Sequence, residues 1–196
     1  MPGMLAVVLA AGASTRMGTH KLLLRLDGEP IVRRTAREVC AAGFDAVVVI
    51  VGYEHDRVVA ALEGLPVRCA VNADFASGMG SSFRTAIEQS GDADAAMFAL
   101  ADQPFVAAHD YRRLLDTYRA QQPAIVSVRY GEVTAPPHLF ARPLFRELSE
   151  LEHGARSILQ RHADEMIVLQ FPPELLQDID TPEDYERAKT LFSSRR

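Results

Sequence analysis

The chain has 196 residues, a length that suits one domain with a substantial core. Its hydrophobic content of 48% and charged content of 24% are typical of a soluble globular protein. The net charge of −5 argues against a nucleic-acid or membrane-surface protein, because both need a basic face. The longest apolar stretch, residues 4–13, is too short to cross a bilayer. We therefore expect one cytoplasmic domain over residues 1–196, with Cys40 and Cys69 as reduced thiols in its core.

Short apolar runs alternate with helical patterns along the first two thirds of the chain. Strands are predicted at Leu5–Leu9, Ala46–Val51, Val67–Val71, Ala95–Leu100 and Ala124–Val128. Helices are predicted between them, at Ile31–Ala42, His55–Glu63, Gly80–Gln89 and Tyr111–Gln121. Strands without polar interruptions suit a mostly parallel sheet that is covered by helices on both faces. Right-handed crossovers then bring the carboxyl ends of the strands to one edge, where open α/β sheets bind ligands.

The pattern changes after Val128. Residues 130–140 suggest a hairpin whose prolines confine it to the edge of the sheet. Two short helices, Arg142–Leu151 and Ala155–His162, and a last strand, Met166–Leu169, are expected to follow. Thr181, with Pro182 next and Asp184 three positions on, predicts the start of a final helix.

The segment that follows the first strand, Leu9–Lys21, carries the clearest functional signal. Its Gly, Ala, Ser and Thr residues let backbone N–H groups approach an anion closely. Arg16 and Lys21 add two cations that suit phosphate oxygens. Five residues separate Gly12 and Gly18, so this is not a Walker loop, and the dinucleotide fingerprint is also missing. A turn that is glycine-rich only for packing would not call for both cations.

Acidic residues follow two of the later apolar segments. Asp102 follows the strand Ala95–Leu100 and could bind Mg²⁺, or it could cap the helix that begins near Ala107. Asp178 and Asp180 lie two residues apart on one face of an extended segment. They could face the same metal ion, or Asp180 could cap the final helix.

Further polar residues are expected at the same edge. Asn72 follows the third strand and could contact a base or ribose. Ser82 belongs to a small-residue turn that suits close approach of a ligand, although Ser81 or Ser82 could instead cap a helix. Arg156 could meet an anionic second substrate or simply be an exposed residue at a helix start. With a phosphate loop, two cations, several carboxylates and no nucleophile pattern, the residues favour phosphoryl or nucleotidyl transfer.

The pattern G-x-x-x-R-M-G-x-x-K, from Gly12 to Lys21, resembles the opening of MobA-like NTP transferases, and the resemblance extends from Val7 to about Phe192. It implies a three-layer, Rossmann-like nucleotidyltransferase fold. It implies catalytic roles for Arg16, Lys21 and Asp102 and a Mg²⁺ site at Asp102 and Asp180. The residues implied to bind the nucleotide are Leu9, Ala10, Ala11, Gly12, Arg16, Lys21, Asn72, Ser82 and Asp102.

Within that family the chain is similar to molybdenum cofactor cytidylyltransferases, because Ala10-Ala11-Gly12 stands where guanylyl members carry Ala-Gly-Gly. The resemblance implies CTP and a molybdopterin acceptor as substrates, pyrophosphate as product and a client molybdoenzyme as a partner. Residues 135–140 depart from the family pattern by an extra proline and a lost glycine, which leaves the acceptor open. The alternatives are a sugar- or alcohol-phosphate nucleotidyltransferase, a non-catalytic cofactor-insertion chaperone and, on weaker grounds, an NAD(P)H-dependent reductase.

Overall fold

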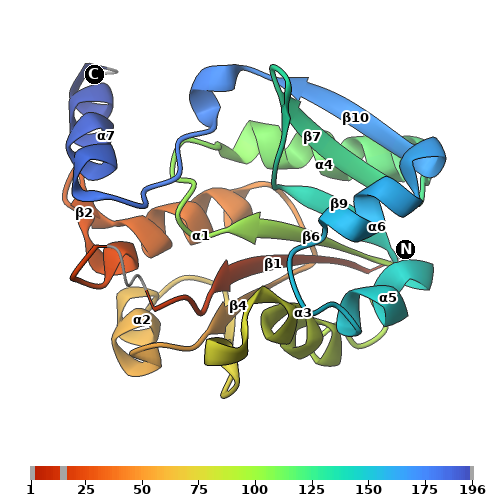
Figure 1. Cartoon of the computed structure of the whole chain (residues 1–196), viewed down its shortest axis with the longest axis horizontal. Helices are drawn as coiled ribbons and strands as arrows, with labels where there is room; N and C mark the ends of the chain where they lie inside the picture. Colours follow the sequence, from red (N-terminus) through yellow and green to blue (C-terminus); the bar gives the residue numbers. More distant parts are fainter. Residues whose placement is uncertain (1–2, 14–16, 195–196) are drawn as a thin grey trace.

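An eight-stranded sheet forms the middle layer of the fold (Figure 1). We describe it from a computed structural model that covers residues 3–13 and 17–194. The strand order is β10-β7-β9-β6-β1-β4-β5, and β8 pairs with β7. The strands of this sheet are β1 (Met4–Ala10), β4 (Ala46–Val51), β5 (Arg68–Val71), β6 (Ala95–Leu100), β7 (Ile125–Tyr130), β8 (Val133–Thr134), β9 (His138–Ala141) and β10 (Met166–Phe171).

Helices cover both faces of this sheet, and a small sheet of β2 (Arg25–Leu26) and β3 (Glu29–Pro30) lies beside it. The α-helices are α1 (Ile31–Ala41), α2 (His55–Ala61), α3 (Met79–Glu88), α4 (Ala108–Gln121), α5 (Phe145–Ser149), α6 (Arg156–Arg161) and α7 (Pro182–Ser194). Short 3₁₀ turns occur at η1 (Lys21–Leu23), η2 (Phe75–Ser77), η3 (Arg142–Leu144), η4 (Ala163–Glu165) and η5 (Pro173–Leu175). In the described part of the chain, no helix has the length and apolar character needed to cross a membrane.

Alternation along β1 explains the three layers. Met4, Ala6 and Val8 face one hydrophobic cluster, which contains the buried sides of α1 and α4. Leu5, Val7 and Leu9 face a second cluster, which α3, α5 and α6 cover. Burying each large aliphatic side chain contributes about 1.5–3 kcal/mol. Side chains on both faces of β1 therefore stabilise its position in the middle layer. The central strands are therefore apolar along their whole length, as the sequence predicts.

The sheet is parallel around β1 and mixed beyond β6. β1 pairs in parallel with β4 and β6, and β10 pairs in parallel with β7. The expectation that residues 130–140 stay at an edge is wrong for their last part, because β9 lies between β6 and β7 and is antiparallel to both. Pro136 and Pro137 precede β9, so they remove no hydrogen bond from its ladder.

Several predicted boundaries move for local reasons. α4 begins at Ala108, three residues before the predicted start, because the Asp110 carboxylate accepts a hydrogen bond from the Ala107 N–H. α3 begins at Met79 after Gly78, so neither Ser81 nor Ser82 is its N-cap. Cys69 is exposed on the edge strand β5, which corrects its assignment to the core.

Candidate active site

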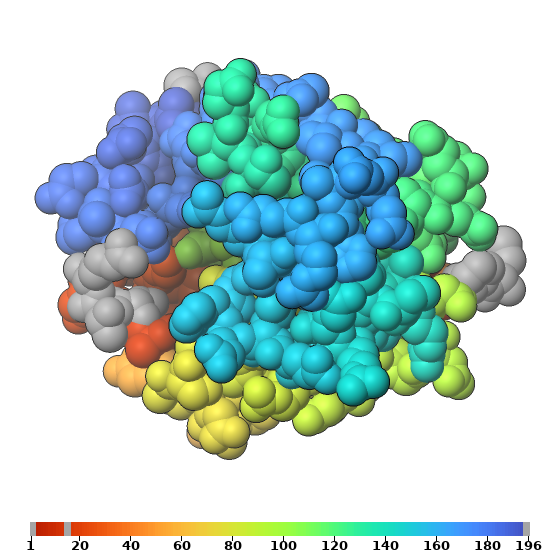
Figure 2. Space-filling view, turned by 45° about the vertical axis from the view of Figure 1, so that its right-hand side comes forward, coloured from red at the N-terminus to blue at the C-terminus, as the bar shows by residue number. Residues whose placement is uncertain are grey.

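The carboxyl ends of β1 and β6 open onto a cavity of about 470 Å³. Figure 2 shows this face hollowed between the red and orange N-terminal segment, the cyan residues near 150 and the blue C-terminal segments. Most of the predicted site residues line the cavity: Leu9–Gly12, Lys21, Ser82, Asp102 and Asp180. Arg16 lies outside the described residues, so its predicted role stays a prediction.

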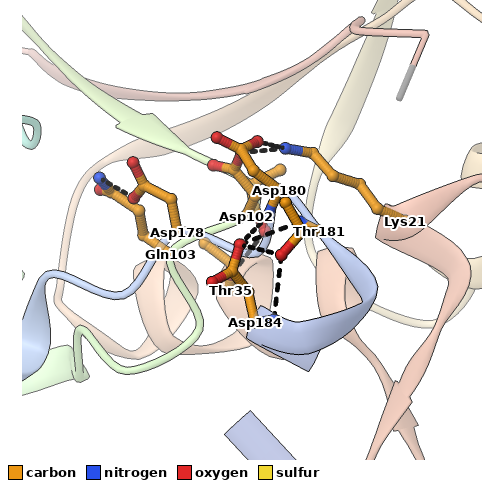
Figure 3. A network of polar contacts seen from close by, with 9 residues as sticks. Lys21, Thr35, Asp102, Gln103, Asp178, Asp180, Thr181 and Asp184 are labelled. Atoms are coloured by element: carbon orange, nitrogen blue, oxygen red, sulfur yellow. Dashed lines mark hydrogen bonds and ion pairs between the residues drawn. The ribbon is translucent and has the colours of Figure 1, made fainter. Parts of the chain in front are cut away.

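Lys21 joins two carboxylates that are far apart in sequence (Figure 3). Its Nζ atom donates to Asp102 Oδ2 and to Asp180 Oδ1, each at 2.6 Å. Burial alone would lower the pKa of the Lys21 ammonium, but the charges and hydrogen bonds of Asp102 and Asp180 outweigh it and raise that pKa. The Lys21 side chain therefore keeps its positive charge at the carboxyl edge of the sheet.

Asp178 adds a third carboxylate to the cavity wall. Its Oδ1 accepts a hydrogen bond of 2.9 Å from Gln103 Nε2. Burial and the neighbouring charge of Asp102 raise the pKa of Asp178, although the bond from Gln103 opposes the shift. The side-chain oxygen of Gln103 is buried and has no partner in the described part of the chain. Gln103 is therefore an additional polar residue of the site that we did not single out from the sequence.

Backbone contacts place Asp102 and Asp180, and other residues do the helix capping. The Ala101 N–H donates to Leu9 O, and the Ile179 N–H donates to Asp102 O, so the β6 exit is tied to β1 and to the acidic segment. Asp110 caps α4, and Thr181 with Asp184 caps α7. The capping alternatives for Asp102 and Asp180 are thus wrong, because both carboxylates turn toward Lys21 instead.

Asn72 is held inside the protein rather than in the wall of this cavity. Its side chain is 2% exposed, and Nδ2 donates to Ser81 Oγ at 2.8 Å and to Ser82 Oγ at 3.0 Å. Its Oδ1 accepts from the Asp74 N–H. In this arrangement Asn72 positions Ser82, which does line the cavity, and its direct contact with a nucleoside stays a prediction.

A close backbone approach shapes the loop after β1. A Cβ atom at Gly52 would lie 2.7 Å from Ala11 O and 2.7 Å from Phe75 Cβ. The Tyr53 N–H donates to Ala11 O at 3.2 Å, and His20 stacks on Tyr53 with a centroid distance of 5.5 Å. Gly52 therefore lets the β4 exit pack directly against Ala11. Phe75 also lines the cavity. In the sequence, only its position after the strand β5 indicates that it lies at this edge of the sheet.

The carboxylates fit a metal that arrives with a nucleotide. Among residues 3–13 and 17–194, no cluster of three or more His, Cys, Asp or Glu residues is arranged to hold an ion. Mg²⁺ is commonly bound by one or two carboxylates together with substrate phosphates. Asp102 and Asp180 supply two hard oxygen donors of that kind, close to a loop that suits a triphosphate.

A mixed sheet between helical layers, with a small-residue loop, a lysine and carboxylates at its carboxyl edge, defines a nucleotide-binding α/β protein. The chain belongs to the family of the MobA-like NTP transferase domain, which it matches over residues 6–166.

Relatives from this family extend over nearly the whole chain. The chain is 32% identical to the purine catabolism protein PucB of Bacillus subtilis, over 98% of both chains. It is 29% identical to the nicotine blue oxidoreductase of Paenarthrobacter nicotinovorans, over 98% of this chain and 96% of the relative. It is also 29% identical to a probable molybdenum cofactor guanylyltransferase of Natronomonas pharaonis, over 95% of this chain and 97% of the relative.

Solved structures agree with the fold. A nucleotidyl transferase from Methanothermobacter superposes with a TM-score of 0.88 at 25% identity and 99% coverage of both chains. Rv0371c of Mycobacterium tuberculosis, in a complex with manganese, superposes with a TM-score of 0.79 at 28% identity, over 96% of this chain and 98% of that one. The α/β nucleotidyltransferase fold predicted from the sequence is thereby confirmed.

Proposed function

We propose that this protein is a Mg²⁺-dependent nucleotidyltransferase that transfers the cytidylyl group of CTP to a terminal phosphate of molybdopterin. The acceptor phosphate oxygen would form a bond to the α-phosphorus of CTP, and the bond to pyrophosphate would break. One observation carries this proposal: Lys21, Asp102 and Asp180 meet within hydrogen-bond distance, beside the loop after β1.

The residues of the loop suit the triphosphate. Ala10, Ala11 and Gly12 line the cavity and have no bulky side chains, so backbone N–H groups could lie against phosphate oxygens. Lys21 carries the charge that would neutralise those oxygens. Nucleotidyl transfer needs little covalent chemistry from the protein, since positioning and charge stabilisation lower most of the barrier.

Asp102 and Asp180 would hold the magnesium ion together with the phosphates. When bound, Mg²⁺ would polarise the phosphate oxygens and offset the charge that develops on the leaving pyrophosphate. To bind the ion, both carboxylates would have to exchange Lys21 for it, and Lys21 would turn to the phosphates. The short ion pairs of Lys21 therefore support a site that rearranges when the metal-bound nucleotide enters.

Ala11 supports cytosine as the base. Ala11 is 5% exposed and lines the cavity, and a Cβ atom at Gly52 would lie 2.9 Å from its methyl group. A methyl at this position narrows the pocket relative to glycine, which favours the smaller pyrimidine ring. The probable guanylyltransferase among the relatives makes GTP the direct competitor in any test.

The two lysines of the chain, Lys21 and Lys189, allow a direct binding test. CTP with Mg²⁺ is titrated by calorimetry into the wild type, Lys21→Met and Lys189→Met. Lys21→Met should bind CTP much more weakly, because the charge that would meet the phosphates is gone. Lys189→Met should bind CTP like the wild type, because Lys189 lies on α7 beside Glu186 and Tyr185. The same CTP affinity in Lys21→Met and in the wild type would contradict the proposed site.

A turnover assay tests the reaction itself. Pyrophosphate release should be saturable with CTP, Mg²⁺ and molybdopterin, and weaker with GTP. Release with sugar phosphates would move the protein to the alternative acceptor class. Nucleotide binding without pyrophosphate release from any acceptor would favour the insertion chaperone, and oxidation of NAD(P)H would favour a reductase.

A further inference from the structure

A second cavity, of about 840 Å³, adjoins the first. Leu9, Met79 and Leu100 line both cavities, so the two lie side by side. We call the second space the apolar cavity. Its floor is made of buried side chains from the sheet and from the helices above it: Leu9, Phe83, Phe98, His138 and Leu159.

Charged residues of the apolar cavity lie on its rim. Glu132 beside β8 and Arg156 at the start of α6 line it and are exposed to solvent. The floor instead contains two aromatic rings, Phe83 and Phe98, with centroids 4.8 Å apart. A sugar would bring many hydroxyl groups that this floor could not pair, whereas a flat, uncharged ring system would be stabilised by the aromatic and aliphatic surface.

His138 is the one exception to the apolar character of the floor residues named above. It is 5% exposed and lies on β9, next to Phe98 of β6 in the sheet register. Its Nδ1 atom lies 3.0 Å from the hydroxyl of Ser127 on β7. With Nδ1 turned toward Ser127, the opposite edge of the ring, which carries Nε2, is the part of His138 that can face the cavity.

The surroundings of Ser127 select the tautomer of His138. Ser127 is fully buried, and within residues 3–13 and 17–194 its hydroxyl has His138 Nδ1 as its hydrogen-bond partner. If Nδ1 carried the proton, the hydroxyl hydrogen of Ser127 would be buried without an acceptor, which is unfavourable. The hydroxyl therefore donates to Nδ1, and Nε2 carries the ring proton. Burial lowers the pKa of His138 to about 3, so the ring is neutral at any working pH.

We infer that the apolar cavity binds a planar heterocycle of the acceptor, and that His138 determines specificity by donating from Nε2–H to a ring carbonyl oxygen. Ser127 is a positioning residue that holds the donor tautomer. The inference rests on the proposed function only in naming this heterocycle as part of the acceptor.

The test compares two fluorescent ligands of the same shape. Pterin presents a carbonyl oxygen at its position 4, and 2,4-diaminopteridine presents an amino group there. The chain contains no tryptophan, so ligand fluorescence can be titrated without indole emission from the protein. The wild-type protein should bind pterin at least about tenfold more tightly than 2,4-diaminopteridine. In the diamino ligand the amino group at position 4 would face Nε2–H of His138, and two donors cannot form a hydrogen bond. Equal binding of the two ligands would overturn the inference without any mutation.

Variants then assign the preference to His138. His138→Leu should abolish it by weakening pterin binding, whereas His138→Gln, which keeps an N–H donor at a similar distance, should retain most of it. Ser127→Ala should reduce the preference, since Nδ1 then loses its donor. A preference that survives in His138→Leu would refute the role of His138.

A separate measurement distinguishes this inference from the proposed function. Thermal stabilisation by CTP and Mg²⁺ should be the same in His138→Leu and in the wild type, which also shows that the variant folds. If CTP does not bind the wild type but pterin preference persists, the apolar cavity stands and the nucleotide assignment fails. If CTP binds and the pterin preference is missing, or sugar phosphates occupy the cavity instead, the inference about His138 fails.

Discussion

Replacing Lys21 by Met tests the ion-pair cluster at the centre of the site. The variant keeps the length and much of the apolar stem of lysine but removes the charge that Asp102 and Asp180 share at 2.6 Å each. The two carboxylates would then lose the cation that both of them contact. The substitution should destabilise the free protein and, if the proposed function holds, also reduce turnover.

The expected loss of stability follows from how exposed the partners are. The side chains of Lys21 and Asp102 are 14% and 17% exposed, whereas Asp180 is 40% exposed. Removing one partner of a fully buried pair costs about 3–5 kcal/mol, and an exposed pair contributes about 0–1 kcal/mol. We expect a loss between these limits, about 2 kcal/mol, which lowers the Tm of a protein of this size by about 4–8 °C. Calorimetry at low ionic strength measures the change.

The dependence on pH has a definite sign. The raised pKa of Lys21 means that its stabilisation is fully present below the ordinary value of 10.5 and is lost only as the pH rises through the higher folded value. Lys21→Met lacks this group, so its stability should not show the same loss. The stability gap between variant and wild type should therefore narrow as the pH rises through the folded pKa of Lys21.

The affinity for a metal ion is a second measurement on Lys21→Met, and it is expected to change in the opposite direction to the stability. Without Lys21, Asp102 and Asp180 should bind Mn²⁺ in the absence of nucleotide more tightly than in the wild type. An ion present at about 100 times its Kd would restore about 2.7 kcal/mol. Turnover should nevertheless fall by a factor of about 10²–10³, as when one preorganised donor to a transition state is removed.

Lys189→Met is the matched control, because it removes the other lysine of the chain from an exposed pair with Glu186. Lys189→Met should change the unfolding free energy by less than about 0.5 kcal/mol and should not change the affinity for Mn²⁺. An unchanged Tm in Lys21→Met, or the same Mn²⁺ affinity as the wild type, would refute the structural argument for the cluster.

Three further substitutions test neighbouring parts of the site. Asp102→Asn should lower Mg²⁺-dependent turnover by about 10² or more while the far-ultraviolet circular dichroism is kept, and unaltered metal dependence would remove Asp102 from the metal site. Ala11→Gly should reduce the preference for CTP over GTP by about tenfold in kcat/KM, and a preference as strong as before would show that this methyl does not select the base. Gly52→Ala should cost about 1–3 kcal/mol and weaken nucleotide binding, since its Cβ would lie 2.7 Å from Ala11 O. If the free energy of unfolding of Gly52→Ala in urea equals that of the wild type, the loops after β1 and β4 separate easily.

The sequence by itself determined the layers of the fold and the location of the site. Apolar runs such as Leu5–Leu9 and Ala95–Leu100 are local signals, since a strand covered on both faces has no polar alternation. The small residues and cations of Leu9–Lys21 are likewise a local signal, because they predict a phosphate-binding loop from one short segment. Right-handed crossovers bring the carboxyl end of the strand before Asp102 to the same edge of the sheet as that loop.

Only the tertiary structure decided how these residues meet. Asp102 and Asp180 could each have capped a helix. Thr181 and Asp184 already marked the start of the last helix in the sequence, but nothing near Asp102 in the chain shows that Asp110 caps α4 instead. The placement of β9 inside the sheet also could not be predicted, because strand order depends on which faces fit together over long distances in the chain. That placement sets His138 beside Ser127, and the pair acquires its chemistry from burial, which a sequence pattern does not specify.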